Sequence, residues 1–214
     1  TGNAEISSTQ ETLVPTPTEE EADAVPLSPL RKRLAKRLTE IAREVPQFTT
    51  IDEADVTEIV RRRKELGEAL FAREGIHLTY THFIAWATLR ALERIEFGSV
   101  NARLVGDVRY QFKEIHLGMA VAVTDGLIVP VIKSAGTLAF TDLAMRIQIL
   151  ADQARQGTLE PKSVVGSTFT ITNPGAAGSI FATPILNPPE AVILGVGAIR
   201  KCVVSLDDGT IGVR

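Results

Sequence analysis

The segment from residue 166 to residue 175 reads Gly-Ser-Thr-Phe-Thr-Ile-Thr-Asn-Pro-Gly and carries hydroxyl side chains that could contact a ligand. Threonines alternate with Phe169 and Ile171, which predicts a strand over residues 168–172 with one apolar face and one hydroxyl face. The last hydroxyl, Thr172, precedes a turn rich in Gly, Asn and Pro, where a rigid strand end and glycines favour ligand contact. The alternative is an ordinary β-hairpin with a solvated threonine face.

Histidines are the other common catalytic side chains, and the sequence has three: His77, His82 and His116. None has a second His, Cys or carboxylate at metal-ligand spacing, so no metal site is predicted and a structural role is favoured for each. No Walker loop or Gly-x-Ser-x-Gly elbow occurs, and Arg200 stands where a dinucleotide fingerprint needs its third glycine. These observations exclude the commonest nucleotide and hydrolase sites.

The composition is that of a globular protein rather than a nucleic-acid or membrane protein. Of 214 residues, 44% are hydrophobic, and the formal net charge is −3, which gives no general attraction to nucleic acid or anionic lipid. No apolar run reaches the roughly 20 residues that span a bilayer. The single cysteine, Cys202, excludes an intrachain disulfide. A cytoplasmic protein is expected, with the mitochondrial matrix as the alternative.

The pattern of residues predicts an acidic linker followed by one mixed domain. Residues 1–26 contain six acidic side chains and no basic one, which is typical of a flexible segment. Apolar periodicity predicts helices from Ser28 to Val45, over residues 57–73, from Thr79 or Thr81 to Ile95, and over residues 141–156. Strands are expected over residues 47–56, 108–112, 115–123, 127–132, 168–172, 191–196, 201–206 and 211–213. The fold class is therefore α/β or α+β with a mixed sheet.

Seven motifs in this order resemble the catalytic domain of the 2-oxo acid dehydrogenase acyltransferases, the E2 components. They are Ser-Pro-Leu-Arg-Lys-Arg-Leu-Ala-Lys-Arg from residue 28, Pro-Gln-Phe-Thr from 46, Asp-Glu-Ala-Asp-Val-Thr from 52, Arg-Lys-Glu-Leu from 63, Asp-Gly-Leu-Ile-Val-Pro-Val-Ile-Lys from 125, Gly-Ser-Thr-Phe-Thr-Ile-Thr-Asn from 166, and Thr-Pro-Ile-Leu-Asn-Pro-Pro-Glu-Ala-Val-Ile-Leu-Gly from 183. The resemblance covers the chain from about Val25 onward.

The resemblance implies a chloramphenicol-acetyltransferase-like fold, a two-layer sandwich with a mixed sheet packed by helices, in a homotrimer or a larger hollow core. It implies transfer of an acyl group from dihydrolipoamide to coenzyme A as the substrate, without a metal. The lipoyl group would be carried on a separate domain, and the E1 and E3 components would be partners. In this chemistry a thiol attacks a thioester, and the resemblance assigns Thr172 as the donor to the oxyanion.

The resemblance also implies the coenzyme A contacts Arg63, Thr79, Asn173, Gly197 and Ile199. The alternative for Arg63 is a solvated charge, because it belongs to an arginine triplet. Two further polar contacts of some family members are replaced by Ala122 and Ala151. The basic first helix could contact nucleic acid, but a solvated face or a subunit contact is favoured.

One departure concerns the general base. The family uses a histidine in an Asp-His-Arg-x-x-Asp-Gly motif, which is absent from these 214 residues, and none of the three histidines lies in its context. We therefore expect residues 27–214 to be an acyltransferase domain without its C-terminal histidine segment. A free thiol is mostly protonated at neutral pH, so the chemical step should be slow without a base. The alternative is a non-catalytic scaffold or assembly protein.

Overall fold

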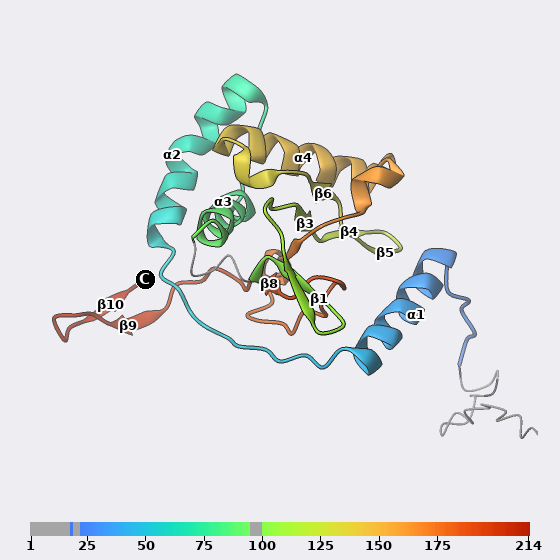
Figure 1. The fold of residues 1–214 in the computed structure, drawn as a ribbon. Helices are drawn as coiled ribbons and strands as arrows, with labels where there is room; N and C mark the ends of the chain where they lie inside the picture. Colours follow the sequence, from blue (N-terminus) through green and yellow to red (C-terminus); the bar gives the residue numbers. More distant parts are fainter. Residues whose placement is uncertain (1–17, 19–21, 95–99) are drawn as a thin grey trace, which may run out of the picture.

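The computed structural model describes residue 18 and residues 22–94 and 100–214. Helices α2, α3 and α4 lie together on one side of a small central sheet, and α1 lies apart on the opposite side of the molecule (Figure 1). The helices are α1 Pro29–Glu44, α2 Thr57–Glu74, α3 Tyr80–Leu92 and α4 Phe140–Gln156. Short 3-10 helices lie in the connections at η2 Ala135–Thr137, η3 Pro161–Val164 and η4 Pro174–Ala177.

Local sequence signals explain where the helices begin and end. The Ser28 hydroxyl caps α1 by accepting the N–H of Arg31 at 3.3 Å, and Pro29 occupies the first turn, where its missing N–H costs nothing. Gly75 and Gly157 end α2 and α4 in the left-handed conformation, with φ of 68° and 71°. The predicted helices therefore lie within one or two residues of their observed bounds, with one exception: α3 ends at Leu92, before the predicted end at Ile95, which falls outside the described residues.

The central sheet has four strands in the order β6–β3–β7–β8. Its strands are β3 Leu117–Met119, β6 Val131–Ile132, β7 Phe169–Thr172 and β8 Ile193–Gly195. β3 pairs antiparallel with β6 but parallel with β7, and β7 pairs parallel with β8 in the register Thr172 opposite Gly195. The expected mixed sheet is confirmed.

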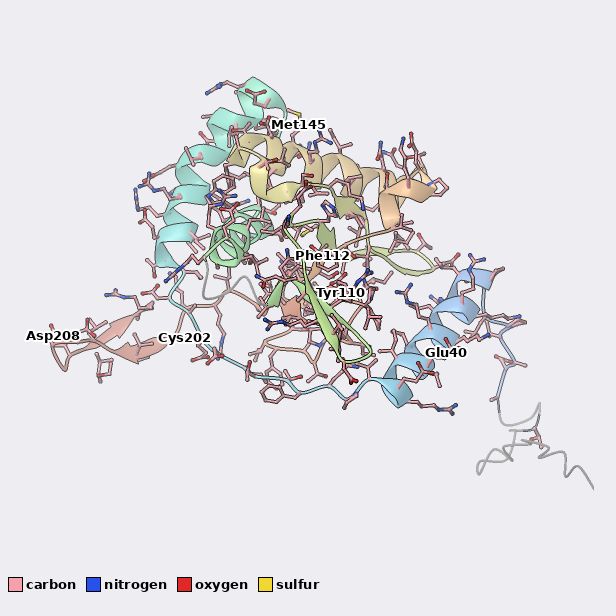
Figure 2. The ribbon with its side chains drawn as sticks, viewed as in Figure 1. Glu40, Tyr110, Phe112, Met145, Cys202 and Asp208 are labelled. Carbon is pink, nitrogen blue, oxygen red and sulfur yellow. The ribbon has the colours of Figure 1, made fainter. Side chains whose placement is uncertain are left out.

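Three two-stranded hairpins surround this sheet. They are β1 Ala102–Val105 with β2 Val108–Gln111, β4 Val121–Val123 with β5 Gly126–Ile128, and β9 Val203–Ser205 with β10 Ile211–Val213. Asp208 lies at the tip of the β9–β10 hairpin, which projects from the body of the molecule (Figure 2). The guanidinium of Arg103 lies over the rings of Tyr110 and Phe112, which covers one face of the β1–β2 hairpin.

The hydrophobic core lies between the sheet and helices α3 and α4. Its buried members come from both layers: Ala85, Leu89 and Leu92 of α3, Leu143 and Ile147 of α4, and Leu117, Met119, Ile132, Phe169 and Ile171 of the sheet. On the opposite face of the sheet, Thr170 lies in one row with the apolar residues Val131 and Ile193. Helix α1 approaches that side through Arg37, which donates to Asn187 Oδ1 at 2.9 Å. The domain is thus a two-layer sandwich.

Four strand predictions are wrong in detail. The predicted strand 127–132 divides into β5 and β6, because residues 129 and 130 lie in no strand and the two parts pair with different strands. Residues 47–56 form no strand and run as an exposed segment between α1 and α2. The predicted strand 115–123 divides at Ala120, because β4 leaves the sheet to pair with β5. β7 and β8 are parallel, so they do not form a hairpin, and the threonine face is not solvated: Thr168 and Thr170 are buried.

Within the described residues, no helix is both long and apolar enough to cross a membrane. Most of the predicted linker, residues 1–17 and 19–21, lies outside the described part of the chain.

Candidate functional site

A cavity of about 270 Å³ lies where the N-terminus of α3, the turn after β7 and the chain after β8 meet. Its lining residues are Thr79, Tyr80, Thr81, Ile84, Asn173, Gly175, Ala176, Val196, Gly197 and Ile199. Three segments distant in sequence therefore form one site, and each follows or precedes a regular element that fixes its position. Four residues predicted from the sequence as coenzyme A contacts lie in this lining: Thr79, Asn173, Gly197 and Ile199.

Asn173 joins two walls of the cavity. Its Nδ2 donates to the Thr81 hydroxyl at 2.8 Å, which connects the turn after β7 to the first turn of α3. Its Oδ1 accepts the N–H of Ala176 at 3.0 Å and so caps η4. Asn173 is therefore held from both ends.

Thr172 stands at the end of β7, next to this cavity but outside its lining. Its carbonyl accepts the N–H of Val196 at 2.9 Å, so the backbone is fixed by the sheet. The side chain is half-buried, and no other residue in the described part of the chain forms a hydrogen bond with its hydroxyl. A rigidly placed hydroxyl with a free O–H can donate to a bound ligand.

Gly175 and Gly197 allow the backbone segments of the cavity wall to touch. A Cβ at Gly175 would lie 2.2 Å from the Gly197 carbonyl carbon, and a Cβ at Gly197 would lie 2.0 Å from the Ile180 carbonyl oxygen. Both neighbours are backbone atoms, so any side chain would push the segments apart. The shape of the cavity thus depends on these two glycines.

Arg63 lies beside the cavity rather than in it. Its Nε donates to the Leu78 carbonyl at 3.1 Å, and its guanidinium carbon is 5.4 Å from the centre of the Tyr80 ring, which lines the cavity. The side chain is exposed, and its other N–H groups have no partner among the described residues. Arg63 differs in this from Arg61 and Arg62, which form ion pairs with Glu58 on the same helix.

The three histidines have structural contacts. His82 Nδ1 accepts the N–H of Thr79 at 2.8 Å, and His116 Nδ1 accepts the N–H of Ser134 at 3.0 Å. The His77 ring packs against the Phe71 ring, with 4.5 Å between the ring centres and an angle of 39° between the ring planes. Burial lowers the pKa of His82, so its imidazole is neutral at physiological pH. In the described residues, no group of three His, Cys, Asp or Glu side chains is arranged to hold a metal ion.

Sequence reasoning missed the lining residues Tyr80, Thr81, Ile84, Gly175, Ala176 and Val196. Tyr80 and Thr81 directly follow Thr79, which was predicted as a contact at a helix N-terminus. Their position in the sequence could therefore have indicated that they line the cavity. Ile84 and Val196 are apolar residues whose place in the cavity depends on the tertiary approach of α3 to β8. Ala122 and Ala151, at the positions of further family contacts, do not line the cavity.

Comparison with known proteins places this chain in a family. The family model described as the catalytic domain of the 2-oxoacid dehydrogenases acyltransferase matches residues 19–214. The chain belongs to this family. It is 39% identical over 176 residues to the succinyltransferase component of the 2-oxoglutarate dehydrogenase complex of Escherichia coli, covering 82% of this chain and 43% of that protein. It is also 39% identical over 180 residues to the acetyltransferase component of the acetoin cleaving system of Bacillus subtilis, covering 84% and 45%.

The chain thus spans just under half the length of these curated acyltransferases. Solved acyltransferase cores have the same fold. The probable dihydrolipoamide acetyltransferase of Listeria monocytogenes superposes with a TM-score of 0.85 at 35% identity, covering 90% of this chain and 81% of that one. The dihydrolipoamide acetyltransferase of Azotobacter vinelandii superposes with a TM-score of 0.86 at 31% identity, covering 94% and 84%. The expected chloramphenicol-acetyltransferase-like α/β fold is confirmed.

Proposed function

We propose that residues 27–214 form the acyltransferase core of a 2-oxo acid dehydrogenase complex, which transfers an acyl group from dihydrolipoamide to coenzyme A. The observation that carries this proposal is the cavity between α3 and β8. Four residues that the family resemblance links to coenzyme A come from three distant segments and lie in its lining. Curated relatives named as succinyl- and acetyltransferases give further support.

In this reaction the sulfur of coenzyme A attacks the carbonyl carbon of the acyl-dihydrolipoyl thioester. A new C–S bond forms to coenzyme A, the C–S bond to the dihydrolipoyl group breaks, and the proton of the attacking thiol passes to the leaving thiol. The carbonyl oxygen carries negative charge in the tetrahedral intermediate. Thr172 would donate its O–H to that oxygen from the end of β7, where its backbone is held by Val196.

Coenzyme A would bind along the cavity with its phosphates toward Arg63. The guanidinium is held by the Leu78 carbonyl and the Tyr80 ring but keeps N–H groups free for an anion. Thr79 and Asn173 would supply polar contacts, and Gly197 and Ile199 a close apolar wall.

We assign the general base to none of the histidines in this chain. His116 Nδ1 accepts a backbone N–H, so the neutral ring carries its proton on Nε2 and presents a donor there. The same argument applies to His82, which is also buried. The base would belong to the histidine-motif segment of the family.

We further propose that the chain works as a trimer or a larger core, in the cytoplasm, with lipoyl domains and the E1 and E3 components as partners. A solved relative is the cubic core of a pyruvate dehydrogenase complex. The exposed apolar side chains of Phe48, Ile51 and Phe181 would be covered by another copy of the chain. Light scattering coupled to size exclusion would test the oligomeric state. Residues 1–26 would serve as the linker to other domains.

The decisive test is Thr172→Ala, with Thr172→Ser as the matched control, in the chain extended by the family's histidine segment. Transfer from acetyl-dihydrolipoamide to coenzyme A should fall about 100-fold or more in the alanine variant, because one oxyanion donor is lost. The serine variant should keep most of the turnover, and both should bind coenzyme A normally. Unchanged turnover in Thr172→Ala would remove this residue from the mechanism. Binding without any transfer by the parent protein would instead indicate a scaffold.

A further inference from the structure

The N-terminus of α3 has an unusual capping arrangement beside the cavity. Thr79 is the N-cap, and the side chain three residues later, His82, accepts the N–H of Thr79 at 2.8 Å through Nδ1. Glu or Gln normally occupies this position of a capping box, since its side-chain oxygen accepts the same N–H. The Thr79 hydroxyl also lies 2.9 Å from Nδ1. The imidazole is therefore an acceptor for the residue that opens the cavity wall.

The chemical state of His82 follows from this contact. An atom that accepts a backbone N–H carries no proton, so the neutral ring is protonated at Nε2. His82 is 3% exposed, and its Nε2 has no hydrogen-bond partner among the described residues. Burial is the main cause that lowers the pKa of the imidazole. The protein keeps a titratable group here at a position where an amide would cap the helix equally well.

The capped turn is also the turn that forms the cavity. Thr79, Tyr80 and Thr81 all belong to the lining, and Thr81 accepts the Asn173 Nδ2–H from the opposite wall. Loss of the cap would therefore disturb two walls together. The cap and the cavity are one structural unit.

We infer that His82 is a positioning residue for the ligand cavity: the neutral ring holds the first turn of α3 in place, and protonation at Nδ1 breaks the hydrogen bond from the Thr79 N–H and weakens ligand binding. The identity of the ligand as coenzyme A rests on the proposed function. A protonated ring has N–H groups on both nitrogens, so Nδ1 can no longer accept the Thr79 N–H. Ligand affinity should then fall on acidification, and it should fall only below the ordinary histidine pKa of about 6.5.

The charged groups on the elements packed around His82 do not account for a pH response at the cap, so we attribute that response to the His82 ring. From α2, Arg63 reaches the Tyr80 ring. Glu58, Arg61, Arg62 and Glu65 of that helix form exposed ion pairs, and Lys64 and Glu68 are exposed. From α4, the buried side chains toward α3 are apolar, and Asp142 and Arg146 are exposed. η2 has no titratable side chain, and on α3 itself Arg90 pairs with Glu93 at the far end. None of these charges contributes to the pKa shift of His82.

The test compares His82→Gln with His82→Leu. Glutamine keeps an acceptor and cannot titrate, whereas leucine has a similar volume and no acceptor. At neutral pH the glutamine variant should bind coenzyme A like the parent, and the leucine variant should bind about tenfold more weakly, as expected for one lost hydrogen bond. Calorimetry at neutral and mildly acidic pH would give the affinity of the parent for coenzyme A divided by that of His82→Gln. This ratio should fall as the pH is lowered. This ratio cancels the titration of the coenzyme A phosphates, which both proteins share.

A ratio that stays constant with pH, together with normal binding by His82→Leu, would overturn the inference. Absence of coenzyme A binding by the parent itself would overturn the proposed function instead. The role of His82 would then be decided without ligand, by nitrogen NMR of the ring and hydrogen exchange of the Thr79 amide. The inference is supported by two results. Nδ1 of the parent is unprotonated, and the Thr79 amide is protected from hydrogen exchange in the parent and in His82→Gln but not in His82→Leu. A protonated Nδ1 at neutral pH, or equal protection in all three, refutes it.

Discussion

The two faces of β7 are both buried, but by opposite chemistry. On one face, Phe169 and Ile171 pack into the hydrophobic core against helices α3 and α4. On the other face, the Thr168 hydroxyl accepts the His116 N–H at 3.0 Å, and the Thr170 hydroxyl donates to Glu190 Oε1 at 2.9 Å. Burial of the first face is favourable through the apolar area removed from water. The second face is tolerated only because its polar groups have partners.

Glu190 is the centre of the polar face. Its Oε1 accepts hydrogen bonds from Ser167, Thr170 and Asn187, whereas its Oε2 is buried without a partner in the described residues. Arg37 of α1 donates to Asn187 and so ties the helix to the same cluster. The carboxyl therefore joins β7, the segment before β8 and α1. The polar face of β7 thus also contributes to fixing the strand, and Thr172 continues that face to the cavity.

The largest expected effect comes from the apolar face. Ile171→Ala removes a side chain that is 0% exposed and leaves a cavity in the packed core, so the free energy of unfolding should fall by about 3–4 kcal/mol. Denaturant unfolding would measure this loss. Ile211→Ala is the matched control, since Ile211 is 79% exposed and should change stability by less than about 0.5 kcal/mol. Equal effects of the two substitutions would contradict the assignment of the core face.

The polar face should give a slightly smaller loss. Glu190→Ala leaves the donors of Ser167, Thr170 and Asn187 without their acceptor, so stability should fall by about 2–3 kcal/mol. Glu190→Gln keeps a carbonyl oxygen for the three donors and should change stability by less than about 1 kcal/mol at neutral pH. The same unfolding experiment distinguishes the two variants. A glutamine variant as unstable as the alanine variant would show that the cluster requires a carboxyl rather than an acceptor.

Sequence reasoning predicted the strand β7 but not its surroundings. Alternation of threonine with Phe169 and Ile171 is a local property, and the observed strand has these bounds within one residue. The burial of the threonines depends on Glu190, which lies twenty residues away from Thr170 and reaches it only in the folded chain. The parallel pairing of β7 with β8 could have been predicted, because the long connection over residues 173–192 suits a crossover better than a hairpin.

The incorrect strand prediction for residues 47–56 also reflects the limits of local sequence. This segment has strand-like residues, including the exposed Phe48 and Ile51, but it pairs with no strand in the described part of the chain. A strand needs a partner, which local sequence does not supply. The candidate site came from the family resemblance, whereas the close backbone approaches at Gly175 and Gly197 and the part played by His82 required the tertiary structure.

The smallest predicted effect is a pH dependence of the free energy of unfolding, which arises from the polar face and not from the apolar face. Burial raises the pKa of Glu190, against the opposing effect of its three hydrogen bonds and of Arg37. The unfolded chain releases this proton near the ordinary carboxyl pKa, whereas the folded chain holds it to higher pH. Between these two pKa values the folded state binds more protons, so stability falls as pH rises.

Glu190→Gln removes this titration, while Ile171→Ala does not touch it. The free energy of unfolding of the parent protein, minus that of Glu190→Gln, should therefore decrease as pH rises above about 4.5 and then level off. The same difference taken with Ile171→Ala should stay flat, which makes the apolar face the internal control. A difference that instead grew with pH would mean that Arg37 and the three donors stabilise the ionised carboxylate more than burial penalises it.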